Sequence, residues 1–286
     1  KKISKKENIS VVGVDIGGAT TDVFSMFNGN FNRTVSANLG MSYSICNVLA
    51  ESGYESISKW LPFSIHEEDL TDRIANKMIR PTTIPQSIEE LIIEQALARE
   101  ALRLSFNQHK EFAVSLKGIQ QKRTISEAFE QSSSGKTLVN MKELDLIVGS
   151  GGVLSHAPRR NQSFMMMIDS FKPEGITQIA VDSIFMMPQL GVLSSIHDEA
   201  AIEVFNKDCL VRLGTTINPI IRKNTDNNHL FDYAFSFNGE DFNGNIDSNQ
   251  IKLFEIPYEK VEVVLKPSNN VDLGNGFGEE VSTSIF

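Results

Sequence analysis

The sequence has few cysteines and no long apolar run. Two cysteines, Cys46 and Cys209, occur among its 286 residues, far apart and without the spacing of a disulfide framework or a metal site. A disulfide-stapled protein is therefore not expected, and a reducing, cytoplasmic location is the default expectation. Because no apolar stretch approaches the roughly 20 residues of a membrane-spanning helix, we expect no membrane partner.

Basic charge is also scarce. The 27 lysines and arginines are outnumbered by 36 aspartates and glutamates, which gives a formal net charge of -9. Surfaces that bind nucleic acid are usually basic, so nucleic acid is not an expected partner. The five histidines are scattered, and the stretch HEED at 66–69 is more typical of a solvated helix start than of a metal site.

The sequence contains both strand and helix patterns. The β-branched stretch ISVVGVDI at 9–16 predicts a buried strand, and NGN at 28–30 predicts a hairpin turn after the next strand. Two helices are predicted from capping-box patterns, which pair Ser64 with Glu67 and Ser87 with Glu90.

The order of these patterns predicts an α/β protein with a helical insertion. A polar, serine-rich loop is expected at 118–140, and short β-type stretches follow residue 209. The predicted domains are a core of residues 8–55 and 141–208, an inserted mainly helical subdomain of residues 56–140, and a β-rich region of residues 209–286.

The stretch DIGGATTD at 15–22 carries the side chains that a phosphate loop needs. Glycines let backbone N–H groups approach a phosphate, threonine hydroxyls add donors, and a carboxylate at a strand end can hold Mg²⁺ through water. It is not a Walker loop, because no lysine follows, and it is not a dinucleotide fingerprint, because a strand follows. A glycine-rich β-turn explains this stretch equally well. The candidate residues are Asp15, Gly17, Gly18, Thr20, Thr21 and Asp22.

A second predicted strand also ends in glycines. LIVGSGGVL at 146–154 places Gly149, Gly151, Gly152 and Val153 before a predicted helix. Small residues there would let an adenine ring or ribose lie against the backbone, although a tight strand-to-helix turn is the simpler explanation. Two such strands separated by a helical insertion favour a nucleotide site.

These two stretches resemble a known superfamily. DIGGATTDV is similar to the second phosphate loop of the actin-like ATPases, with Ala19 where many members have a third glycine, and LIVGSGGVL is similar to their adenosine motif. The flanking stretches RTVSANLGMSYS, VGSGGVLSHAP, MMPQLGVLS and DLGNGFGEEV resemble the MutL/GlmL accessory protein family, which is associated with glutamate mutase and related cobalamin-dependent enzymes.

The resemblance implies a specific fold, ligand and partner. It implies the second lobe of an actin-like (ribonuclease H-like) ATPase that binds ATP or ADP with Mg²⁺, with Asp15 as the catalytic and metal-holding residue. It also implies an ATP-binding reactivating, chaperone-like protein for a cobalamin-dependent mutase subunit. Because one phosphate loop is found and the chain opens without methionine, we expect the C-terminal half of a longer ATPase, inactive without its first lobe.

Two other functions remain open from the sequence. A small-molecule kinase of the same superfamily would need a general base, for which Asp22 is the candidate. A non-catalytic scaffold would be expected to have lost Asp15, Gly17, Gly18 or Thr20, and all four are present.

Overall fold

The structure is a computed structural model that describes residues 1–114, 137–222, 228–256 and 260–285. Most of the loop predicted at 118–140 lies outside the described residues. The chain divides into two compact units. Unit 1 comprises Lys1–Ile16 and Met141–Phe286, and unit 2 comprises Gly17–Asn140. Each unit is described by itself.

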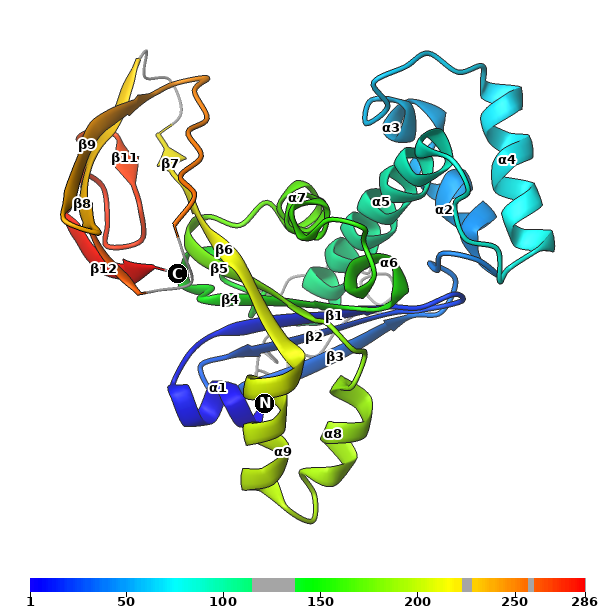
Figure 1. Cartoon of the computed structure of the whole chain (residues 1–286), viewed down its shortest axis with the longest axis horizontal. Helices are drawn as coiled ribbons and strands as arrows, with labels where there is room; N and C mark the ends of the chain where they lie inside the picture. Colours follow the sequence, from blue (N-terminus) through cyan, green and yellow to red (C-terminus); the bar gives the residue numbers. More distant parts are fainter. Residues whose placement is uncertain (115–136, 223–227, 257–259, 286) are drawn as a thin grey trace, which may run out of the picture. The chain divides into compact units, whose positions relative to one another are not determined.

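Unit 1 contains a mixed sheet whose strands run in the order β1-β4-β5-β6 (Figure 1). The pairs β1–β4 and β4–β5 are parallel, and β5–β6 is antiparallel. Every residue of β4 is buried, as expected for a parallel strand covered on both faces. The four strands are β1 (Val11–Ile16), β4 (Leu146–Ser150), β5 (Gly175–Asp182) and β6 (Leu210–Asn218).

Helices cover this sheet. Helix α7 contacts β4, β5 and β6, and its Met166 and Met167 are fully buried, so much of the methionine run packs in the core. The helical elements of unit 1 are α1 (Lys2–Glu7), η1 (Met141–Glu143), α6 (Gly152–Ser155), α7 (Arg160–Phe171), α8 (Met187–Leu193), α9 (Asp198–Val204) and the π-turn η2 (Phe205–Cys209).

The C-terminal part of unit 1 is rich in strands. A second sheet has the order β12-β10-β8-β9, and a short ribbon pairs β11 with β7. Asp272 fixes the glycine-rich segment that follows it, because its Oδ1 accepts hydrogen bonds from the N–H groups of Gly274 and Gly276 and its Oδ2 accepts one from Lys142 Nζ. The strands are β7 (Ile220–Ile221), β8 (His229–Phe237), β9 (Glu240–Asp247), β10 (Val261–Pro267), β11 (Val271–Asp272) and β12 (Val281–Ile285).

The described part of unit 2 combines a hairpin with the helices α2 to α5. The long helix α5 contacts both hairpin strands and the helices α2 and α3. The hairpin turn has positive φ at both Asn28 and Gly29, as in a type I′ turn. The elements are β2 (Thr21–Phe27), β3 (Asn30–Ser36), α2 (Ile45–Ser52), α3 (Tyr54–Ser58), α4 (Glu67–Ile79) and α5 (Ile88–Phe112).

The α/β class and the β-rich C-terminal part agree with the sequence analysis, and the actin-like fold stays a prediction. The capping box of Ser87 and Glu90 is confirmed. The one predicted at Ser64 is wrong, because α4 has His66 as its N-cap and places Glu67 in its first turn, where the helix dipole favours acidic side chains. The compact units do not coincide with the predicted domains, and β6 pairs with β5 although it follows residue 209.

Candidate functional site

The carboxyl ends of β1, β4 and β5 meet at one edge of the unit 1 sheet, because these strands are parallel. Ligands of open α/β sheets bind in the crevice at this edge. Asp15 lies near the end of β1 in register with Ser150 of β4, and its side chain is half-buried. β5 ends at Asp182, which is fully buried. The edge therefore carries two carboxylates and a hydroxyl in neighbouring strands.

The three candidate glycines at the end of β4 and in the turn after it have different surroundings. A Cβ at Gly149 would lie 2.7 Å from the Sδ of Met167, so this glycine makes room for α7. A Cβ at Gly151 would lie 2.8 Å from the carbonyl carbon of Ile16, and Gly151 has a φ of 105°, so the turn after β4 is pressed against the end of β1. A Cβ at Gly152 would meet no atom within 4 Å. The backbone at Gly152 is thus exposed and open, and Val153 beside it is half-buried.

Asp182 is a residue of this edge that the sequence analysis missed. Its Oδ2 accepts a hydrogen bond of 2.7 Å from the N–H of Met187 at the start of α8, and its carbonyl accepts one of 2.5 Å from Ser155 Oγ. Ser150 Oγ lies 3.4 Å from the same carboxylate. Asp182 therefore connects the ends of β4 and β5 with the turns that follow them. Only its position at the end of a predicted strand could have pointed to it.

Residues 17–22 of the predicted phosphate loop at 15–22 lie in unit 2 and form a closed turn. Gly17 N–H donates to the carbonyl of Thr20 at 2.8 Å, and the carbonyls of Gly17 and Gly18 accept hydrogen bonds from Met41 and Ser42. Within the described part of the chain, the N–H groups of Gly18 and Ala19 donate no backbone hydrogen bond. The loop thus keeps two adjacent backbone donors for an external acceptor.

Gly40 is a second residue that the sequence analysis missed. A Cβ on Gly40 would lie 2.6 Å from the backbone nitrogen of Ala19 and equally near the carbonyl carbon of Gly18. The segment after β3 therefore supports the predicted phosphate loop from behind, and only glycine permits this approach.

Two polar side chains of the loop form hydrogen bonds inside unit 2, and a third lies on the loop itself. Thr21 is fully buried and donates its hydroxyl to the carbonyl of Leu39 at 2.6 Å, so the structure gives it a role inside unit 2. Asp22 Oδ1 accepts two hydrogen bonds from Arg33 of β3, at 2.9 and 3.1 Å. Thr20 is half-buried and lies on the loop itself, which leaves it as the hydroxyl best placed for a ligand.

The residues fit a nucleotide phosphate better than a metal held by protein alone. Two adjacent N–H donors and an open glycine backbone suit an anion or a flat ring approaching the main chain. Among the described residues, no group of three or more histidine, cysteine, aspartate or glutamate side chains is placed to hold a metal ion. Asp15 as a single carboxylate fits Mg²⁺, which keeps several of its waters when it binds beside phosphates.

The two cysteines do not add a reactive group to this edge. Burial, together with the nearby charges of Asp182 and Asp208, raises the pKa of the Cys209 thiol, and the side chain is fully buried. Cys46 is half-buried on α2. We also find no helix in the described part of the chain with the length and apolarity needed to cross a bilayer.

The elements and their topology define a mixed α/β protein. A family model described as MutL protein matches residues 1–209. Protein MutL of Clostridium tetanomorphum is 25% identical over 219 residues, which cover 69% of this chain and 44% of that protein. The chain therefore belongs to the MutL protein family, and it spans less than half of the length of this relative.

Proposed function

We propose that this chain binds ATP or ADP with Mg²⁺ and forms part of an ATP-dependent accessory protein that reactivates a cobalamin-dependent mutase. The nucleotide part of the proposal rests on the geometry of the candidate residues. The accessory role rests on membership of the MutL family and on the resemblance of the flanking stretches to the accessory proteins of glutamate mutase.

The observation that carries the proposal is the contrast between Gly151 and Gly152. Gly151 is fixed by its contact with Ile16, whereas the space beside Gly152 is empty of protein atoms. A glycine that the fold itself does not require, at the carboxyl edge of an α/β sheet, leaves room for a ligand to approach the backbone. We assign this position to the adenosine part of the nucleotide.

The phosphate part is assigned to Asp15 and to the loop that follows it in the chain. The N–H groups of Gly18 and Ala19 and the hydroxyl of Thr20 would donate to phosphate oxygens, and Asp15 would orient waters of the magnesium ion. Bound Mg²⁺ would supply neutralisation of phosphate charge. Phosphoryl transfer depends on positioning and electrostatics from several directions, so we expect the 286-residue chain alone to bind nucleotide weakly and to hydrolyse it negligibly.

Calorimetry with MgATP and MgADP on this chain and on a longer MutL-family protein tests the nucleotide proposal. Gly152→Ala is the sharpest variant, because the added methyl meets no protein atom yet occupies the space assigned to the ligand. Gly191→Ala in α8 is the matched control, since a Cβ there also meets nothing within 4 Å. We expect weaker binding for Gly152→Ala alone. Absence of binding by both proteins would refute the nucleotide proposal and favour the scaffold.

Asp15→Asn tests the metal-holding role separately. We expect it to weaken MgADP binding and to leave binding of metal-free ADP nearly unchanged. Steady ATP turnover by this chain that Asp15→Asn abolishes would overturn the expectation that it is inactive alone. Co-purification of the longer protein with a mutase subunit would support the accessory role, and transfer of phosphate to a small molecule would support the kinase instead.

A further inference from the structure

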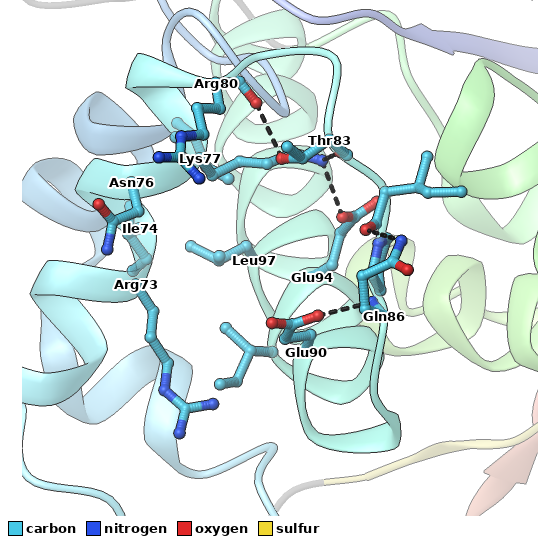
Figure 2. A pocket seen from close by; sticks show the side chains of 14 residues that line it. Arg73, Ile74, Asn76, Lys77, Arg80, Thr83, Gln86, Glu90, Glu94 and Leu97 are labelled. Atoms are coloured by element: carbon cyan, nitrogen blue, oxygen red, sulfur yellow. Dashed lines mark hydrogen bonds and ion pairs between the residues drawn. The ribbon is translucent and has the colours of Figure 1, made fainter.

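Unit 2 contains a pocket that the proposed nucleotide site does not use. It has a volume of about 340 Å³ and lies between α2, α4, α5 and the segment 80–87 that connects α4 to α5 (Figure 2). This volume is at the lower end of the range of small-molecule sites, roughly 300 to 1,000 Å³. All lining residues belong to unit 2, so that unit alone defines the pocket.

The floor of the pocket is aliphatic. It is formed by Ile45 of α2, Ile74 of α4, and Ile93 and Leu97 of α5, each at most 5% exposed. Ile84 of the connecting segment adds a wall and is 72% exposed, which is unusual for an isoleucine beside a concave surface. A ligand that covers Ile84 would therefore gain apolar burial without disturbing the floor.

The charged residues of the rim are sorted by helix. Arg73 and Lys77 are four residues apart and share one face of α4, and Arg80 follows the end of that helix as the first residue of the connecting segment. Glu90 and Glu94 lie on the α5 side (Figure 2). The pocket thus has a cationic wall and an anionic wall above an apolar floor.

The anionic wall is already engaged within the protein. Glu94 lies 3.2 Å from Lys77 Nζ in a pair of largely buried side chains, and the same Nζ donates to the carbonyl of Thr83. Glu90 Oε2 accepts hydrogen bonds of 2.6 and 3.3 Å from the N–H groups of Gln86 and Ser87. Glu94 is therefore neutralised by Lys77, and the Oε2 of Glu90 is held by the backbone at the start of α5.

The cationic wall keeps charge for a ligand. Arg80 forms no ion pair with any carboxylate in the part of the chain that the structure describes, and its side chain lines the pocket. Arg73 pairs with Glu89 at 3.1 Å, but both side chains are about half exposed, so the pair is readily exchanged for another anion. The net preference of the rim is for negative charge.

We infer that this pocket binds a small aliphatic carboxylate. Its carboxylate would pair with the guanidinium of Arg80, whose planar fork matches two carboxylate oxygens, and its alkyl chain would cover Ile84 and the floor. An amine would be repelled by Arg80 and would find Glu94 already paired with Lys77, and inorganic phosphate would leave the apolar surface uncovered. The inference does not depend on the proposed nucleotide site.

Hexanoate is the probe, and the 286-residue chain labelled at isoleucine δ1 methyl groups is the reporter. Titration should shift the methyl signals of Ile45, Ile74, Ile84 and Ile93 at millimolar concentrations, as expected for a ligand of this size. Arg80→Gln should weaken binding about tenfold or more, because a charge-assisted hydrogen bond is lost. Lys266→Gln, which removes an exposed lysine of unit 1, should leave the titration unchanged.

The comparison ligands are hexylamine and inorganic phosphate. Hexylamine shifts equal to those of hexanoate would overturn the inference by showing a purely apolar groove, and phosphate binding as tight as hexanoate would overturn it by showing a bare anion site on Arg80. It is also refuted if hexanoate at about 20 mM leaves these four methyl signals in place, or if Arg80→Gln binds as well as the parent chain.

Discussion

Gly151 lies against Ile16 so closely that a Cβ at Gly151 would sit 2.8 Å from the carbonyl carbon of Ile16. The contact joins the turn after β4 to the end of β1, where Asp15 is the preceding residue. The backbone that carries the Asp15 carboxylate is therefore packed against Gly151, where a side chain would not fit.

Gly151→Ala is expected to destabilise the chain by about 2 to 4 kcal/mol. The new methyl would overlap the backbone of Ile16, and the φ of 105° is unfavourable for alanine. Urea unfolding measures the loss. Gly152→Ala is the neighbouring control and should change the free energy of unfolding by less than about 1 kcal/mol; equal losses in the two variants would contradict the geometry described here.

Asp182→Ala should cost about 1 to 3 kcal/mol, because it leaves the partly buried N–H of Met187 without its acceptor. Asp182→Asn retains an oxygen that can accept from Met187, so we expect it to lose less. The midpoints of urea denaturation for the two variants give the comparison. If Asn is as damaging as Ala, the charge of Asp182 matters more than its hydrogen bond to Met187.

His109 should make unit 2 sensitive to mild acid. Burial lowers the pKa of His109 to about 4, and its ring nitrogens lie 2.8 Å from Ser25 Oγ and 2.9 Å from Thr34 Oγ1. The folded state therefore resists protonation of His109. The contribution of the neutral ring to the free energy of unfolding is complete above pH 6.5 and is lost as the pH falls toward 4, by about 3 kcal/mol in total.

Fluorescence of Trp60, the single tryptophan of the sequence, measures this effect, because Trp60 lies in unit 2. Stability between pH 7 and 4 should fall less steeply in His109→Gln than in the parent chain. The exposed His156 gives the control: His156→Gln should keep the parent slope. If the stability of His109→Gln falls with pH as steeply as that of the parent chain, other groups cause the acid sensitivity.

Glu100 is expected to be a stabilising buried carboxylate. Burial opposes its ionisation, but hydrogen bonds from Trp60, Arg103 and Lys59 outweigh burial and lower the pKa of Glu100. Its contribution is thus present above the ordinary carboxyl pKa of 4.5 and is lost as the pH falls below it, a more acidic window than that of His109.

Glu100→Gln at pH 7 should cost about 1 to 3 kcal/mol, less than the roughly 3 to 5 kcal/mol of a fully buried pair, because Lys59 and Arg103 can turn toward water. The emission maximum of Trp60 should also shift, since its Nε1 lies 2.9 Å from Glu100 Oε1. Unchanged stability together with unchanged emission would show that the charge of Glu100 is dispensable.

Local features of the fold could be predicted from the sequence because short-range chemistry determines them. The turn at Asn28 and Gly29 and the cap of Ser87 with Glu90 each involve residues no more than three positions apart. The prediction for the start of α4 is wrong because Ser64 and Glu67 have the spacing of a capping box although the helix begins after His66. Only the backbone geometry shows that His66, and not Ser64, is the N-cap.

Features that depend on distant pairing could not be predicted in the same way. Gly40 supports the loop at Gly18 and Ala19 across the intervening hairpin, and no spacing rule connects them. The antiparallel addition of β6 beside β5 requires the chain to pass through α8 and α9 first. The candidate site residues could be named from glycine patterns. The buried hydrogen bond from Thr21 to the carbonyl of Leu39 could not be predicted in this way.

The interruption of unit 1 by unit 2 has a consequence for the order of folding. Unit 2 is one continuous stretch, whereas β1 pairs within unit 1 with β4, which lies beyond the whole of unit 2 in the chain. At a synthesis rate of about 5 to 20 residues per second, β1 waits on the order of ten seconds for this partner to be made. All of unit 2 is therefore synthesised before β4 exists, so the pairing of β1 with β4 comes late in folding, and a holdase that binds β1 in this interval would delay that pairing further.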